Sequence, residues 1–276
     1  MISSLRYSVL LLVMCFLGVS CPVDVIHADY TTVVIGDRTW TTNNNFDLIG
    51  SSAAVAGGEL RTNIPNFLPT LRNDGPNANL ATLTDIYGLT HESLLGIHPE
   101  TLEWLPKLAS HWIVEEKEDH QVFWYLIDED AKYSDGTSVT ADDVVASYEH
   151  IVDPDIKDPM SANLYTEYYE KPVAHDERVL SVKTKKKAWR TFLYFSASLL
   201  IYPADQIRIP GDVYLDEFNW KMIPGSGPYE LREDSIQQEI SVSLYRRDDW
   251  WGRQTRASQG QYNFDKIQLI VVRDNE

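Results

Sequence analysis

The stretch Tyr133-Ser134-Asp135-Gly136-Thr137-Ser138-Val139-Thr140-Ala141-Asp142-Asp143-Val144 encodes a tight turn followed by the start of a helix. A Gly directly after an Asp is typical of a turn that joins two elements. Thr140 is a good N-cap, Asp143 stands three residues on as in a capping box, and Asp142 favours the positive end of the helix dipole. We therefore predict a helix that begins at Thr140 and ends before Pro154. Its buried stripe is Val144, Val145, Tyr148, Ile151 and Val152.

Two further segments flank this stretch, one on each side. Leu105-Pro106-Lys107-Leu108-Ala109-Ser110-His111-Trp112 comes before it and is followed by Phe123-Trp124-Tyr125-Leu126. Pro224-Gly225-Ser226-Gly227-Pro228-Tyr229 comes after it and is followed by Arg247-Asp248-Asp249-Trp250-Trp251-Gly252. A nucleophile elbow needs Gly-x-Ser-x-Gly after a strand, so Gly225-Ser226-Gly227 indicates a bend that leads Tyr229 into a strand.

In this order and at this spacing, the three segments resemble the family 5 extracellular solute-binding proteins. These are the peptide, dipeptide and nickel receptors of ATP-binding-cassette importers. The resemblance covers residues 58–272 and implies an α/β fold of the type II periplasmic binding protein kind. The chain would form the first lobe, with a strand-rich subdomain, and the second lobe would be missing. It departs from the family pattern at His91 and at Trp250, because the family usually has Tyr or Phe at the first position and Tyr at the second.

The resemblance also implies a domain organisation. Residues 58–91 and 198–272 would form the discontinuous core of the lobe, and residues 92–197 an inserted subdomain. Residues 29–57 are rich in Thr, Asn, Ser, Ala and Gly and have little periodicity, which predicts a flexible tether with room for one short strand. Along residues 58–272, alternation or apolar runs predict strands at 59–64, 121–127, 181–184, 240–244 and 264–272, and apolar spacing predicts a helix over 78–95.

The N-terminus has the pattern of a secretory signal peptide. Arg6 precedes an apolar run, Val9 to Leu17, that is too short to span a bilayer. Two cut sites fit: Gly18-Val19-Ser20-Cys21 resembles a lipoprotein box in which Cys21 would be lipidated, and Ile26-His27-Ala28 offers a later cut. We thus predict a signal peptide over 1–21, or one that extends to 28, and an extracytoplasmic protein for which lipid anchoring stays open.

The composition excludes some classes of function. The chain has 276 residues, 24 Lys and Arg against 41 Asp and Glu, and a net charge of −17. Nucleic-acid binding needs a clustered basic surface, so none is expected. The seven His residues lack the tight spacing of metal ligands, and no nucleotide-binding loop occurs. We expect no metal site, no cofactor and no catalysis.

The loop from Asn73 to Asn79 is the candidate ligand site, because in the resembled family this region faces the binding cleft. Its candidate residues are Asp74, Asn77 and Asn79. The segment His91-Glu92-Ser93-Leu94-Leu95 matches another family segment, and His91 and Glu92 are the remaining candidates. Either Asp74 or Glu92 could hold the N-terminal ammonium of a peptide, whose backbone would be paired like an added strand.

The resemblance implies the substrate-binding component of an importer, which captures oligopeptides or dipeptides in the periplasm and delivers them to a membrane permease. We expect a monomer. Two alternatives stay open. The protein could be a receptor of the same family for nickel chelates or sugars, or a noncatalytic surface-interaction domain that would need no second lobe.

Overall fold

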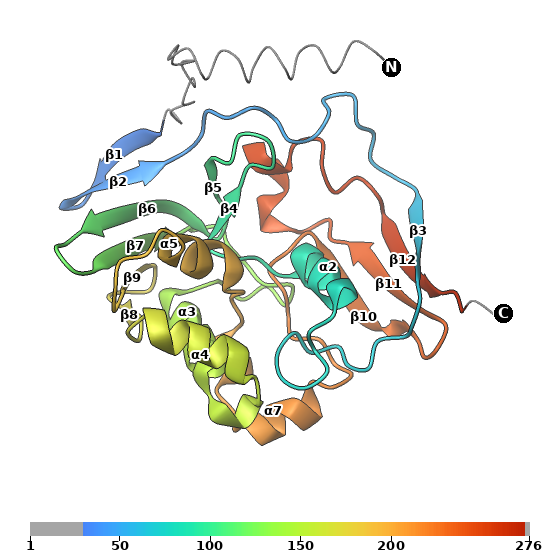
Figure 1. The fold of residues 1–276 in the computed structure, drawn as a ribbon. Coiled ribbons are helices and arrows are strands. Elements are labelled where there is room, and N and C mark those ends of the chain that lie inside the picture. Colours follow the sequence, from blue (N-terminus) through green and yellow to red (C-terminus); the bar gives the residue numbers. More distant parts are fainter. Residues whose placement is uncertain (1–29, 274–276) are drawn as a thin grey trace, which may run out of the picture.

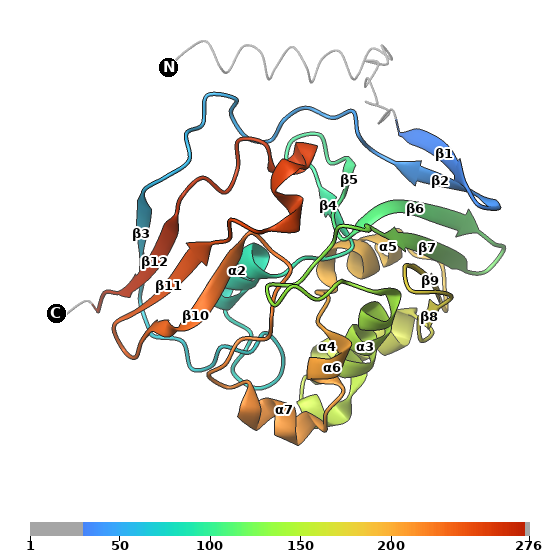
Figure 2. The ribbon, with the colours of Figure 1, turned by 180° about the vertical axis from the view of Figure 1, so that it is seen from behind.

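The computed structural model describes residues 30–273. The predicted signal peptide and Cys21 lie outside these residues. Two sheets lie on opposite sides of the molecule, with helix α2 (Ala81–Thr90) and a small hairpin of β4 (Leu95–Ile97) and β5 (Trp104–Pro106) between them (Figures 1 and 2).

The first sheet has six antiparallel strands in the order β1-β2-β6-β7-β9-β8. Its strands are β1 (Thr31–Ile35), β2 (Arg38–Thr42), β6 (Ala109–Glu116), β7 (Gln121–Ile127), β8 (Val173–Ala174) and β9 (Val179–Lys183). Alternate residues of β7 are fully buried: Phe123, Tyr125 and Ile127. They pack into one core with apolar residues of α3 (Ala141–Val152) and α4 (Pro159–Tyr168).

The second sheet has four strands in the order β10-β11-β12-β3. Its strands are β3 (Glu59–Ile64), β10 (Tyr229–Gln237), β11 (Ser241–Arg246) and β12 (Lys266–Val271). Although β3 and β12 lie at opposite ends of the chain, they pair in parallel, from Glu59 opposite Lys266 to Ile64 opposite Val271. Leu83 and Ile86 of α2 share a core with this sheet. Both parallel strands therefore end at the same edge, where the chain enters the loop that leads to Asn73–Asn79.

Short elements complete the fold. They are α5 (Thr191–Leu193), the π-helical turn Tyr194–Ser198, α6 (Ala204–Ile207), α7 (Gly211–Glu217) and the 3-10 turns Pro154–Ile156, Trp251–Gln254 and Arg256–Ser258.

The local predictions in the middle of the chain are confirmed. Thr140 and Asp143 form the capping box, since each side chain accepts the backbone N–H of the other residue. Asp135 accepts hydrogen bonds from both the backbone N–H and the hydroxyl of Thr137, and Gly136 has a φ of +87°. The expected turn thus leads into the expected helix.

Two predictions need correction. The segment expected to be a tether contains the β1–β2 hairpin, and Trp40 within it is only 2% exposed. This segment joins the first sheet, because β2 pairs with β6 through Thr41 and Trp112. The helix expected over 78–95 is shorter. It stops at Thr90, whose carbonyl accepts a hydrogen bond from the Gly227 N–H, and the backbone at His91 is extended.

The second and third of the three segments that carry the family resemblance meet around Ser226. The Ser226 hydroxyl accepts the backbone N–H of Glu92, and its carbonyl accepts the indole N–H groups of Trp250 and Trp251. The buried guanidinium of Arg247 donates to the carbonyls of Gly225, Gly227 and Tyr133. These two segments thus form one hydrogen-bonded junction between the two sheets.

Candidate functional site

The loop from Leu71 to Asn79 is held in shape by buried polar contacts. The Arg72 side chain, 6% exposed, donates to the carbonyls of Asp74 and Pro76 and to the amide oxygen of Asn219. Tyr87 of α2 donates to the Leu71 carbonyl. In open α/β sheets, ligands bind outside the carboxyl ends of parallel strands. This loop, which follows β3, is therefore preorganised where a ligand is expected.

A cavity of about 310 Å³ opens beside this loop. The loop contributes Asn73, Asp74 and Asn79, α3 contributes Ser147 and His150, and α4 contributes Met160 and Leu164. Segment 198–202 closes the remaining side with Leu199 and Tyr202. The lining thus combines carboxylate, amide, imidazole and apolar groups, as a site for a small polar or peptide-like ligand requires.

Asp74 is the most buried charged group of this cavity. It is 3% exposed, accepts a hydrogen bond of 3.2 Å from the Tyr202 hydroxyl, and lies 3.6 Å from Nε2 of His150. That separation is too long for a hydrogen bond. Nε2 of His150 is buried and has no partner among the described residues. A carboxylate and an unpartnered imidazole nitrogen thus lie together at the cavity.

The Asp74 carboxylate affects the pKa values of four tyrosines. Burial raises the pKa of Tyr87, Tyr165, Tyr202 and Tyr214, and the Asp74 carboxylate raises each of them further. All four phenols stay protonated at neutral pH, so they can donate hydrogen bonds but add no charge. The loop site accordingly has the Asp74 carboxyl group beside four neutral phenols, with the buried Arg72 guanidinium in the same loop.

The structure brings only some of the predicted site residues together. Asp74 and Asn79 line the loop cavity, whereas Asn77 is exposed beside it and has a φ of +65°. His91 is 1% exposed, stacks on Tyr87 and bonds to the Thr90 hydroxyl. Burial lowers the pKa of His91 to about 3, so the ring is neutral. His91 lines neither this cavity nor the one that contains Glu92.

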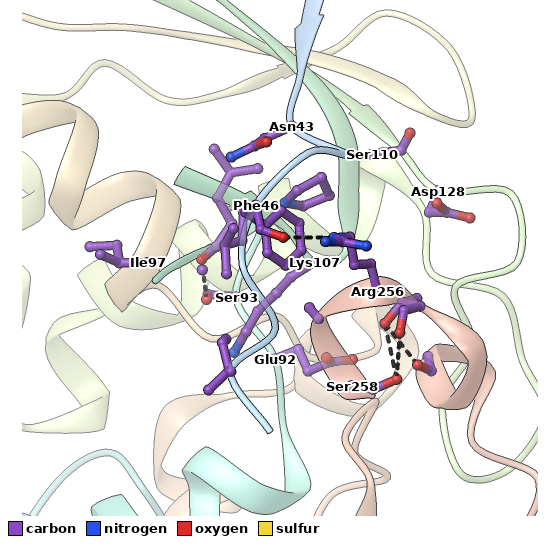
Figure 3. Close-up of a pocket in the computed structure, with 18 of the residues that line it drawn as sticks. Asn43, Phe46, Glu92, Ser93, Ile97, Lys107, Ser110, Asp128, Arg256 and Ser258 are labelled. Carbon is purple, nitrogen blue, oxygen red and sulfur yellow. Dashed lines mark hydrogen bonds between the residues drawn. The ribbon is translucent and has the colours of Figure 1, made fainter. Parts of the chain in front are cut away.

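Glu92 lies in a separate cavity of about 790 Å³ (Figure 3). It is 7% exposed, and its carboxylate accepts a hydrogen bond of 3.1 Å from the Trp251 indole. Burial raises the pKa of Glu92 to about 7, against the opposing charges of Lys107 and Arg247. Glu92 and Asp74 thus cannot serve as one ligand site.

Sequence reasoning missed most of the residues that line the loop cavity, including His150, Met160 and Tyr202. These three lie between 76 and 128 positions after Asp74, and only the fold joins them.

Two kinds of feature are absent from residues 30–273. No cluster of three or more His, Cys, Asp and Glu side chains is placed to hold a metal ion. No described helix has the length and apolar character needed to cross a membrane.

Comparison with curated proteins gives two informative relatives. The chain is 27% identical over 245 residues to the probable peptide-binding protein YejA of Agrobacterium fabrum, an alignment that covers 84% of this chain and 37% of the relative. It is 26% identical over 187 residues to the dipeptide-binding protein DppE of Bacillus subtilis, covering 61% of this chain and 31% of DppE. The chain therefore spans about a third of the length of these relatives.

Solved structures share the fold. The oligopeptide-binding protein AppA of Bacillus subtilis, solved with a nonapeptide, aligns with a TM-score of 0.63 at 23% identity, covering 79% of this chain and 41% of AppA. The binding protein MoaA of A. tumefaciens R10, solved with mannopinic acid, aligns with a TM-score of 0.63 at 20% identity, covering 80% of this chain and 42% of MoaA. The α/β fold expected from the resemblance, that of one lobe of a type II binding protein, is confirmed.

The family match itself is extensive. Residues 103–276, more than half of the chain, match the bacterial extracellular solute-binding proteins, family 5 Middle. They include the turn at Gly136, the junction at Ser226 and the Trp pair. The chain belongs to the family 5 bacterial extracellular solute-binding proteins.

Proposed function

We propose that this chain is part of a receptor that captures peptides outside the cytoplasmic membrane and delivers them to the permease of an ATP-binding-cassette importer. The observation that carries the proposal is the loop cavity, where Asp74, in the loop that follows β3, lies beside the unpartnered Nε2 of His150. The family and its peptide-binding relatives support it.

Asp74 is the proposed acceptor for the N-terminal ammonium of the peptide. A buried carboxylate surrounded by neutral phenols interacts more strongly with a cation than an exposed carboxylate does. Asn79, which is exposed and lines the cavity, offers an amide to the peptide backbone. Backbone pairing of this kind gives affinity with little selection of side chains. Met160, 70% exposed, adds an adaptable apolar surface.

The test is calorimetric titration of pooled di- to hexapeptides into the protein expressed from the complete reading frame that contains these residues. We expect saturable heat at micromolar peptide. Asn79→Ala should weaken binding without loss of stability, and Asp74→Asn should weaken it about tenfold or more, equal to at least about 1.4 kcal/mol. Asn45→Ala, an exposed Asn outside the cavity, is the matched control.

The same titration separates the alternatives. Neighbours of this fold were solved with mannopinic acid and with mannohexaose, so mannopinic acid, mannohexaose and nickel chelates form the second set of probes. If one of these probes gives binding heat and the peptides give none, that ligand class replaces peptides as the proposed ligand of the receptor. A folded sample that binds none of them would favour the surface-interaction domain.

A further inference from the structure

The cavity that contains Glu92 is unused by the proposed peptide site. Most of its walls come from four segments, with Asp128 and two further residues added: Thr42–Ile49 at the end of β2, Glu92–Ile97, Leu105–His111, and Trp250–Tyr262. Its volume of about 790 Å³ is within the range of about 300–1,000 Å³ that is usual for small-molecule sites. Phe46, Leu95, Leu105, Trp250 and Tyr262 supply its apolar and aromatic lining.

Charges of both signs line this cavity without an ion pair between them in the described residues (Figure 3). Glu92 is bonded to Trp251 and forms no ion pair within the described residues. Across residues 30–273, Nζ of Lys107 has no hydrogen bond or ion pair. The Arg256 side chain donates through Nε to the Phe46 carbonyl, and its two terminal nitrogens have no partner in the same residues. Two cationic groups and one buried carboxylate are therefore available to a ligand.

The surroundings of the charged lining groups indicate which of them can bind a ligand. Lys107 lies with its stem against Gly96, where an added Cβ would be 3.2 Å from Cε of Lys107. Asp128, the other carboxylate of the cavity, already accepts the backbone N–H of Asp130. Glu92 is therefore the better acceptor for a ligand cation, and Lys107 and Arg256 are the donors for a ligand anion.

We propose that this cavity is a second binding site, for a free α-amino acid in its zwitterionic form. Its ammonium would lie against Glu92, its carboxylate against Lys107 and Arg256, and its side chain among Phe46, Trp250 and Tyr262. A ligand with a single charge would leave either Glu92 or the pair Lys107 and Arg256 without a counter-charge, and burying a charged group without a partner is costly. A zwitterion matches both. The site is independent of the loop cavity, because the two share no lining residue.

The test uses the same full-length protein and L-leucine as the first probe, followed by the other common amino acids. Saturable calorimetric binding is expected for at least one of them, with unchanged affinity in the presence of saturating peptide. The methyl ester removes the anionic group and the N-acetyl derivative removes the cationic group. Each should bind at least about tenfold more weakly than the free amino acid.

Two variants locate the site. Lys107→Met should weaken amino-acid binding at least about fivefold, and because Lys107 is half-exposed this variant should fold normally. Lys132→Met, an exposed lysine outside both cavities, is the matched control and should leave binding unchanged. Glu92→Gln should weaken binding of the free amino acid more than binding of its N-acetyl derivative.

Three outcomes would overturn the proposal: no amino acid binds below millimolar concentration, Lys107→Met and Glu92→Gln bind normally, or peptide displaces the amino acid. Failure of peptide binding alone leaves this site unaffected, because amino acids are titrated separately.

Discussion

Glu92 shows how burial and charge compete at a single residue. Its carboxyl is 7% exposed, and burial raises its pKa to about 7 although Lys107 and Arg247 act in the opposite direction. In the unfolded chain the pKa returns to about 4.3. Between these two values the folded protein keeps a proton that the unfolded chain has lost. The free energy of unfolding should therefore fall as the pH rises from about 4.3 to about 7, and Glu92 adds no further change above that range.

We predict that Glu92→Gln removes this dependence. Relative to the variant, the wild-type protein should lose stability as the pH is raised from 4.5 to 8, by on the order of 3 kcal/mol over the full range. Urea unfolding of both proteins at several pH values measures the difference. The decisive quantity is how this difference in unfolding free energy changes with pH, because the variant can differ in stability at every pH for other reasons. A difference that does not change with pH would contradict the raised pKa.

Gly225 is required by a close approach between segments distant in the sequence. A Cβ at this position would lie 1.9 Å from the Thr90 carbonyl oxygen and 3.2 Å from Cε1 of His91. Gly225→Ala should therefore destabilise the protein by about 3 kcal/mol or more. Gly88→Ala is the control, since this exposed helical glycine has nothing within 4 Å and should gain about 0.5–1 kcal/mol. Thermal unfolding should show a lower midpoint than the wild-type protein for Gly225→Ala and a higher one for Gly88→Ala.

At the scale of elements, helix α3 depends on its first turn. Thr140 accepts the N–H of Asp143, and Asp143 accepts the N–H groups of Thr140 and Ala204. Thr140→Ala removes one half of this capping box and should cost about 1 kcal/mol. Asp143→Ala should cost more, because it also leaves the Ala204 N–H without its acceptor. Equal costs in chemical unfolding would show that the bond to Ala204 contributes nothing.

Elements defined by local sequence could be predicted, and elements defined by distant partners could not. The capping box at Thr140, the turn at Gly136 and the strand over Glu59–Ile64 each depend on neighbouring residues, and all three are present. Helix α2 ends at Thr90 because Gly227, more than 130 residues later, bonds to its last carbonyl. No pattern near residue 90 contains that information.

At the scale of the whole molecule, the same limit applies to the candidate site. The loop residues Asp74 and Asn79 were predicted and line one cavity, and their role in binding stays a prediction. His150 and Tyr202 join them only because α3 and segment 198–202 pack against that loop. Glu92 was grouped with Asp74 from the sequence, but the junction at Ser226 directs it into the other cavity.

The N-terminal segment is the part of the whole molecule that sequence reasoning described least well. Its Thr-rich and Asn-rich composition predicts a tether, yet the structure joins it to the fold at several points. The Tyr30 hydroxyl accepts the N–H of Trp104, Trp40 is 2% exposed, and the Phe46 carbonyl accepts a bond from Arg256. These contacts connect the first sheet to the walls of the larger cavity.

If this segment is part of the folded unit, Trp40→Ala should destabilise the whole protein by about 3 kcal/mol, the usual cost of removing a buried aromatic side chain. A tether would tolerate the change, as Val34→Ala should, because Val34 is 71% exposed on the same hairpin. Urea unfolding monitored by circular dichroism compares the two variants. If the unfolding midpoint of Trp40→Ala equals that of Val34→Ala, the prediction of a flexible tether is supported instead. A lower midpoint, with one cooperative transition, would make the hairpin a structural part of the lobe, because a locally attached hairpin would unfold separately.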